Sequence, residues 1–515
     1  MLKHLLEFSL RRRLVAVTLF FLVIGAGLYS VRHLTIDAFP DISPNLVQVF
    51  AEVNGLAAQE GEELVTRPVE IIMRGLPGVV KVRSLSSFGL VTINIFFDEK
   101  IDIYRARQLV TEKLGAAAAM LPPGLVPHGL ELGALASGMG KVLGYYLSSR
   151  ELALTELRDL QEWVVKRELQ TVPGVAKIIS QGGHLRQFQI NLDANRLAAY
   201  NLSFAEVAAA VSRENRNFGA GILAQGAEEL IIRGLGRLEN LDDIRKLPVA
   251  WRDRVPIRLA ELGEVETGTA FRRGVALRDG DGEDVSATVH KSYGANSFMV
   301  VKALKQRLDA LASRLPDSVE LKIFYDQGAL VSGSIATVRN ALYSGLLLVS
   351  LVSLVFLRRR RAVLVVIGAL PFACLFSLSL LYLFKIPGDL LSFGGIAIAM
   401  GMIVDATIIM VERLQSAEES KHQRDLPYFR AAAEVAAPIF FAGLIIIIVF
   451  IPIFTLGGVE GKMFRPLALT VSLTIAASLF YALVLAPAFC SLLPVNCPQN
   501  QDRLPAWQSA YQQLL

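Results

Sequence analysis

Six long apolar segments divide this chain and constrain its fold more than any other feature. They run over residues 14–32, 341–357, 362–384, 390–412, 436–456 and 467–493. Each comes close to or exceeds the roughly 20 residues that a helix needs to cross a hydrocarbon core about 30 Å thick. Between the first two lies a polar block, residues 33–336, which is long enough for two domains. We therefore expect a six-span helical membrane domain and a large water-exposed domain.

Clusters of basic residues set the expected orientation of these spans. Residues 1–13 end in three arginines, four arginines at 358–361 follow the second span, and more basic residues occupy the loop 413–435. Because basic loops remain in the cytoplasm, both termini are predicted there, including the tail 494–515, and the block 33–336 faces outward. The first span lacks an A-x-A cleavage site, so we expect an uncleaved anchor. The formal net charge of +5 gives no indication of nucleic-acid binding.

An acidic residue interrupts the fourth span. Asp405 lies within GGIAIAMGMIVDATIIMVERL and, at 1.5 Å per residue, roughly 22 Å into the hydrocarbon core. A carboxylate at that depth is costly, which favours a functional ionisable group on a helix–helix face. Glu412 follows seven residues later, nearly two helical turns, and therefore lies on the same face. The alternative is a buried Asp405 that hydrogen-bonds only for packing, with Glu412 reaching the headgroups.

The outward block contains an internal repeat. Leu-Pro-Gly-Val at 76–79 and Val-Pro-Gly-Val at 172–175 each follow a helix-like stretch and precede two strand-like runs. Proline and glycine just past a helix are stop signals. Each copy continues with another amphipathic helix, so we expect β-α-β-β-α-β units of the split-βαβ, ferredoxin-like kind. The strand pair of the second copy is expected at 175–180 and 186–193, and a Gly-rich stretch at about 218–267 predicts a projecting insertion.

Four motifs stand out along the chain, and together they are distinctive. They are DAFPDISPNLVQV (37–49), LPGVVKVRSLSSFG (76–89), GGIAIAMGMIVDA (394–406) and FIPIFTLGGVEGKMFRPLALT (450–470). With them the whole chain resembles the N-terminal half of a resistance-nodulation-division (RND) efflux permease of the heavy-metal branch. The resemblance implies an α-helical six-span domain and an α+β periplasmic porter domain of ferredoxin-like repeats. It places porter subdomains at 44–133 and 134–330, with a docking insertion at 216–268.

The resemblance also implies a function and partners. Members of this family are secondary active transporters of the bacterial inner membrane, not enzymes, and exchange protons for cargo. Protons pass between an acidic residue of the fourth span and charged residues of a tenth span, so Asp405 and Glu412 are the relay candidates here. With six spans, this chain is expected to need a separate polypeptide that supplies the C-terminal half. A trimer of such units, a periplasmic adaptor and an outer-membrane channel are the other implied partners, and no cofactor is expected.

Two alternatives remain open from the sequence. The SecD-type accessory of protein export also has six spans, a large outward loop and a fourth span similar to GMIVDATIIMVER. The region after Ala436 and the motif at 37–49 favour the efflux permease instead. An inactive, truncated half would look identical in sequence. This alternative has a physical basis, because no other charged residue occupies the interior of the six spans to pair with Asp405.

Sulfur atoms are the candidate ligands for a transported soft cation. Met410, Cys490 and Met402 lie in or near the fourth and sixth spans, and thioether and thiolate ligands suit copper or silver. Copper and silver members of the resembled family line their route with methionine pairs, one of which Met410 and Cys490 could retain. Divalent-cation members carry a further acidic residue where this chain has Ala399. Since methionine is also an ordinary filler of membrane helices, neither metal class is favoured by the sequence.

Other chemistry has little support. The six histidines show no ligand spacing, and no GxxxxGK[ST] loop is present, so ATP is not indicated as the energy source. The outward block contains no cysteine, and its stability must come from ordinary hydrophobic cores.

Overall fold

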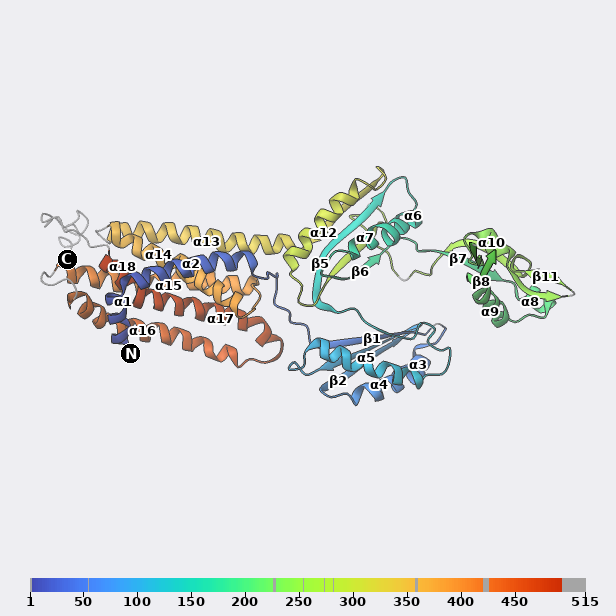
Figure 1. Ribbon diagram of the computed structural model, residues 1–515, viewed down its shortest axis with the longest axis horizontal. Helices are drawn as coiled ribbons and strands as arrows, with labels where there is room; N and C mark the ends of the chain where they lie inside the picture. The colour runs from blue at the N-terminus through green and yellow to red at the C-terminus, as the bar shows by residue number, and fades with distance from the viewer. Residues whose placement is uncertain are drawn as a thin grey trace.

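The computed structural model describes residues 2–53, 55–225, 228–252, 254–272, 274–280, 282–356, 360–419 and 426–492. The molecule is elongated, with the long helices gathered at one end, two α/β units beside one another in the middle and a third unit at the far end (Figure 1). In the described part, six helices are long and apolar enough to cross a membrane. The predicted cytoplasmic tail lies outside the described residues.

The helical end combines one short helix with six long spans. Their bounds are α1 (Leu2–Arg11), α2 (Arg13–His33), α13 (Gln327–Phe356), α14 (Arg360–Leu383), α15 (Leu390–Glu419), α16 (Leu426–Phe454), and a last span formed by α17 (Gly458–Phe480), the π-helical turn η3 (Tyr481–Leu485) and α18 (Ala486–Leu492). Several spans extend past their apolar segments; α13, for example, begins 14 residues before the predicted start at 341. Hydropathy detects only the part of a helix within the apolar layer, whereas its backbone hydrogen bonds continue into water.

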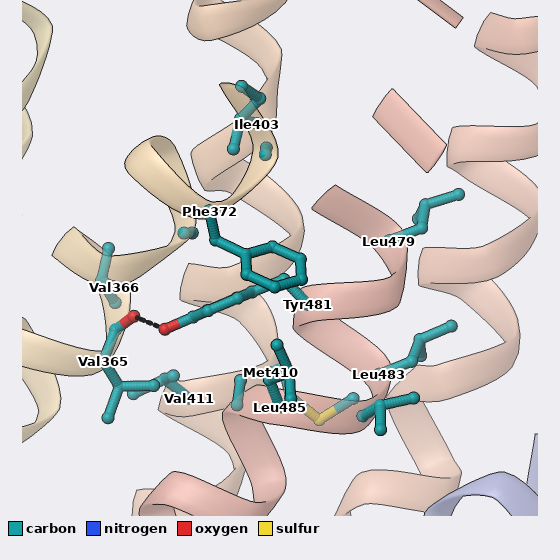
Figure 2. Packing of buried hydrophobic residues seen from close by; sticks show 14 of the residues in the cluster. Val365, Val366, Phe372, Ile403, Met410, Val411, Leu479, Tyr481, Leu483 and Leu485 are labelled. Carbon is teal, nitrogen blue, oxygen red and sulfur yellow. Dashed lines mark hydrogen bonds between the residues drawn. The ribbon is translucent and has the colours of Figure 1, made fainter. Parts of the chain in front are cut away.

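The spans pack around a continuous apolar core. Figure 2 shows its centre, where Phe372 and Tyr481 lie among aliphatic side chains from several helices. The hydroxyl of Tyr481 donates a hydrogen bond of 2.7 Å to the Val365 carbonyl, so its one polar group is satisfied inside the bundle. A buried hydroxyl without such a partner would be destabilising in this apolar environment.

The first soluble unit, here called the first subdomain, covers residues 46–132. Its elements are β1 (Leu46–Glu52), α3 (Ala58–Gly61), η1 (Glu62–Thr66), α4 (Arg67–Arg74), β2 (Val79–Ser87), β3 (Leu90–Phe97), α5 (Ile103–Ala119) and β4 (Leu130–Leu132). The sheet is antiparallel with the order β2-β3-β1-β4. Burial alternates along β1 and β3, so one face of the sheet forms a core with the helices. The Asp102 side chain caps α5 by accepting from two backbone amides of its first turn.

The second subdomain repeats this strand order. It comprises β5 (Ala136–Ser149), α6 (Leu154–Asp159), η2 (Leu160–Val165), α7 (Lys166–Gln170), β6 (Val175–Gln181), β13 (Val285–Ser292), α12 (Ser297–Ala312) and β14 (Val319–Asp326). Its sheet order, β14-β5-β13-β6, places corresponding strands in the same positions as in the first subdomain. The last strand, β14, leads directly into the membrane helix α13. The soluble part is thus a mixed α/β domain joined covalently to the bundle.

The insertion between β6 and β13 is larger than the sequence indicates. It contains β7 (Arg186–Leu192), α8 (Ala194–Tyr200), α9 (Phe204–Glu214), β8 (Phe218–Gln225), β9 (Glu228–Gly234), α10 (Leu241–Lys246), β10 (Pro248–Arg252), β11 (Val255–Arg258), α11 (Leu259–Leu262) and β12 (Gly263–Thr269). The predicted pairing of 175–180 with 186–193 is wrong, since β7 pairs with β12 and β6 pairs with β13. β7, α8 and α9 contribute to the insertion's own apolar core. The insertion therefore begins at β7, and the Gly-rich stretch marks its exposed hairpin, β8–β9.

Candidate functional site

One face of α15 is held firmly against the bundle. A Cβ at Gly395 would lie 2.8 Å from the Leu467 carbonyl oxygen of α17 and would also overlap the Thr470 hydroxyl, so the two helices approach too closely for a larger residue. Further along, the Ser478 hydroxyl donates a 2.7 Å hydrogen bond to the Ile403 carbonyl. Small residues and interhelical hydrogen bonds from hydroxyl groups typically stabilise the packing of membrane helices. They fix this face of α15 on α17.

A different, exposed face of α15 carries Asp405. Along this face, Ile398 and Ile409 are 57% and 48% exposed, and Asp405 and Glu412 are exposed as well. Their spacing of three, four or seven residues forms one stripe along the helix. Among the described residues, the Asp405 carboxylate has no hydrogen-bond or ion-pair partner. The structure thus places both relay candidates on a face that the described chain leaves uncovered.

The C-terminal end of α15 continues past the apolar span and carries several charged side chains. Arg413 forms an ion pair with Glu434 of α16, which ties the two helices together there. The neighbouring Glu412 carboxylate has no partner of its own within the described residues. Glu412 is therefore an exposed carboxylate at the C-terminal end of the span.

The sulfur candidates do not form one site. Met410 is fully buried and packs among aliphatic side chains around Tyr481 (Figure 2), and the half-buried Cys490 packs against the same cluster. Met402 belongs to a different cluster, beside Ile475. Within the described ranges, no group of three or more His, Cys, Asp or Glu side chains could hold a metal ion. Met410 and Cys490 thus share one apolar cluster, and Met402 lies in another.

A further buried acid, Asp389, caps the outer end of α15. Its Oδ1 accepts hydrogen bonds from the Ser392 backbone amide at 2.6 Å and from the Ser392 hydroxyl at 2.8 Å. Its Oδ2 is buried without a partner among the described residues, and the side chain lines a cavity of about 430 Å³ together with Asp37 and Lys291. None of the motifs noted in the sequence includes Asp389, although Asp immediately before an apolar run is a helix N-cap signal.

Comparisons with known proteins agree on one family. A model of the AcrB/AcrD/AcrF family matches residues 5–514. The chain is 35% identical over its whole length to the cation efflux system protein CzcA of Alcaligenes sp. strain CT14, and 34% identical over 90% of its length to the cation efflux system protein CusA of Escherichia coli K12. These matches cover 50% and 45% of those relatives, so the chain spans about half the length of the curated proteins it matches.

The solved structures give the same result. The crystal structure of a heavy metal efflux pump aligns with 94% of this chain, with a TM-score of 0.82 and 33% sequence identity. The alignment covers 48% of the length of that pump. The described residues, membrane bundle and soluble units included, therefore have the fold of about half of that heavy metal efflux pump.

Proposed function

This chain belongs to the AcrB/AcrD/AcrF family of RND permeases, and from that premise we propose that it is a half-size subunit of a proton-driven efflux transporter for heavy-metal cations. The proposal includes a second polypeptide that supplies the complementary C-terminal half. It is supported by relatives whose names describe cation efflux and by their length, about twice the length of this chain.

The observation that carries the proposal is the uncovered face of α15. A carboxylate facing lipid near the middle of a bilayer is costly and is normally found against other protein or a water-filled cavity. Asp405 has no cationic partner in the described part of the chain, and hydrophobic side chains flank it on the same face. A second membrane-embedded chain could bring a charged residue to this face. It would then pair with the Asp405 carboxylate and cover the apolar side chains of the stripe.

The mechanism follows from this position. Asp405 takes up a proton from the outward side and releases it inward, with Glu412 assisting near the cytoplasmic end. Its partner is a lysine or an acidic residue of the complementary half. Protonation removes the attraction between Asp405 and a cationic partner, so α15 changes its equilibrium position against the other half. The movement of α15 then drives the soluble subdomains between open and closed states.

The proposed cargo, heavy-metal cations, rests on the names of the relatives and not on a set of metal ligands in this chain. Because Met402 lies in a different cluster from Met410 and Cys490, we assign the principal cargo ligands to the complementary half. Relatives are named for cobalt, zinc and cadmium resistance as well as for cation efflux, which supports heavy-metal cations as a class. The protein-export alternative has no support among these matches.

We further infer the assembly and its location. The two subdomains have the strand order of ferredoxin-like units, in keeping with porter subdomains on the periplasmic side of the inner membrane. The hairpin β8–β9 of the insertion exposes several large apolar side chains, including Ile222 and Ile231. Such an apolar surface is typical of a protein contact, and we assign it to neighbouring subunits in a trimer that meets an adaptor and an outer-membrane channel.

Cells lacking their own metal exporters provide the test. The chain is expressed alone, with a complementary six-span chain, and as the pair carrying Asp405→Asn, and cell-associated zinc, cobalt and copper are measured by mass spectrometry. We expect lowered metal content only for the intact pair, with Glu412→Gln milder than Asp405→Asn. Full export by this chain alone would contradict the need for a second half. An inactive pair would favour a degenerate protein.

A further inference from the structure

Backbone hydrogen bonds join the N-terminal end of α15 to the segment that connects α2 with the first subdomain. The segment that follows α2 runs beside the turn that precedes α15, with a parallel bridge between Ile36 and Gly388. The Asp37 amide donates to the Gly388 carbonyl at 3.0 Å, and the Gly388 amide donates to the Thr35 carbonyl at 2.9 Å. A third bond, from the Leu390 amide to Ala38, reaches the first residue of α15 itself. Any displacement of α15 therefore displaces the segment that carries Asp37.

The Asp37 side chain extends this connection into the second subdomain. Its Oδ1 accepts from Lys291 Nζ at 2.7 Å and from the Ser297 backbone amide at 3.2 Å. Lys291 belongs to β13 and Ser297 is the first residue of α12. The side chains of Asp37 and Lys291 are only 19% and 10% exposed, so water screens this ion pair much less than a surface pair. Lys291 also donates to the Ala295 carbonyl, which fixes its position in the turn before α12.

A different helix is joined to the first subdomain. Lys462, near the outer end of α17, donates to the Ser43 carbonyl at 2.9 Å and forms an ion pair with Glu99 at the same distance. Glu99 lies between β3 and α5. A cavity of about 700 Å³ lies between the two subdomains and is lined by residues of both together with Lys462. Helix α17 thus contacts the first subdomain beside this cavity, whereas α15 is bonded to the segment that carries Asp37.

We propose that Asp37, through its ion pair with Lys291, is the positioning residue that transmits displacement of α15 to the second subdomain. Without this pair, the backbone contacts of α15 end on the segment that leads to the first subdomain. With the Asp37–Lys291 ion pair in place, a shift of α15 relative to α17 changes the distance between the two subdomains. This inference rests on the proposed function, because it takes the charge state of Asp405 as the cause of the shift.

A competing route through α13 makes the inference testable. Helix α13 follows β14 of the second subdomain, and the Asp326–Lys305 ion pair lies at that junction. Coupling through α13 is covalent and would survive the loss of either ion pair, whereas coupling through the proposed joint depends on the Asp37–Lys291 pair. Lys305→Met is therefore a matched control for Lys291→Met, since each removes one cation from an ion pair of the second subdomain.

The experiment measures the separation of the subdomains by spin-label distance measurements. Labels replace Lys113 of α5 and Lys302 of α12, both exposed, in the full chain purified with its complementary half in lipid nanodiscs. Asp405→Asn is expected to shift the distance distribution by about 2 Å or more, the scale of helix shifts in switching proteins. The shift is expected to disappear with Asp37→Asn or Lys291→Met, to persist with Lys305→Met, and to return when the charges are exchanged in Asp37→Lys/Lys291→Asp.

The possible contrary results distinguish failure of this inference from failure of the proposed function. A shift that survives Asp37→Asn and Lys291→Met in folded protein would overturn the inference and leave the proposed function intact. If Asp405→Asn leaves the spin-label distance distribution unchanged in protein with the native ion pair, the proposed role of Asp405 is contradicted. The inference then fails as well. If the single variants fail to fold, the charge-exchanged protein decides, because it keeps an ion pair between residues 37 and 291. Loss of the Asp405→Asn shift in that protein would also overturn the inference.

Discussion

At the scale of single residues, the spacing of Asp405 and Glu412 was sufficient to place them on one face of a helix. Seven residues are nearly two turns, and the structure exposes both side chains on one stripe of α15. The sequence could not reveal that this face is uncovered in the described chain, because helix neighbours are set by tertiary packing. The same limit applies to the sulfurs. Met402 and Met410 are eight residues apart, an offset of about 80° around the helix, and they pack into different clusters.

Met410 tests whether a sulfur of this chain is needed for transport. Leucine has a similar volume, so Met410→Leu should change the free energy of unfolding by less than about 1.5 kcal/mol and leave metal export unchanged. Met410→Ala should lower stability by about 2–5 kcal/mol, because the side chain is fully buried and a cavity would remain. Thermal unfolding of the purified protein and metal accumulation in cells measure the two effects. Loss of export by a stable Met410→Leu protein would make the sulfur a ligand.

At the scale of elements, close packing of α15 on α17 depends on one glycine of an adjacent pair. Gly395→Ala would place a methyl group against the Leu467 carbonyl, whereas a Cβ at Gly394 meets nothing within 4 Å. We expect Gly395→Ala to lower stability by roughly 1–3 kcal/mol through overpacking and to impair export. Gly394→Ala should be neutral or slightly stabilising, because alanine is the better helix former. Thermal unfolding of the two proteins provides the comparison, and equal melting temperatures would show that the helices can move apart freely.

The strands show where pattern alone fails. Strand runs and the Pro-Gly stops predicted two similar α/β units, and both sheets have the same order of corresponding strands. In the second unit the run at 186–193 is a strand, as predicted, but it pairs with β12 instead of β6. Alternating hydrophobicity identifies a strand and its buried face without specifying its neighbour. The choice of partner depends on residues far along the chain, so the start of the insertion was not readable from the sequence.

At the scale of the whole molecule, the arginine clusters predict both termini in the cytoplasm and the soluble units outside. In a variant without its native cysteines, we introduce single cysteines at the exposed positions His4 and Glu112. A membrane-impermeant maleimide added to intact spheroplasts should label Glu112→Cys strongly and His4→Cys only after permeabilisation. Equal labelling of both positions in intact spheroplasts would contradict the six-span topology.

The central claim is that proton movement through Asp405 drives metal transport by a two-chain unit. The most direct measurement uses inside-out membrane vesicles with an acidified lumen, in which lumenal pH and metal uptake are followed together after addition of zinc. The account predicts metal-dependent loss of lumenal protons with zinc uptake for the intact pair, and neither response when the pair carries Asp405→Asn at the same protein level. Undiminished zinc uptake and proton release with Asp405→Asn would contradict the claim.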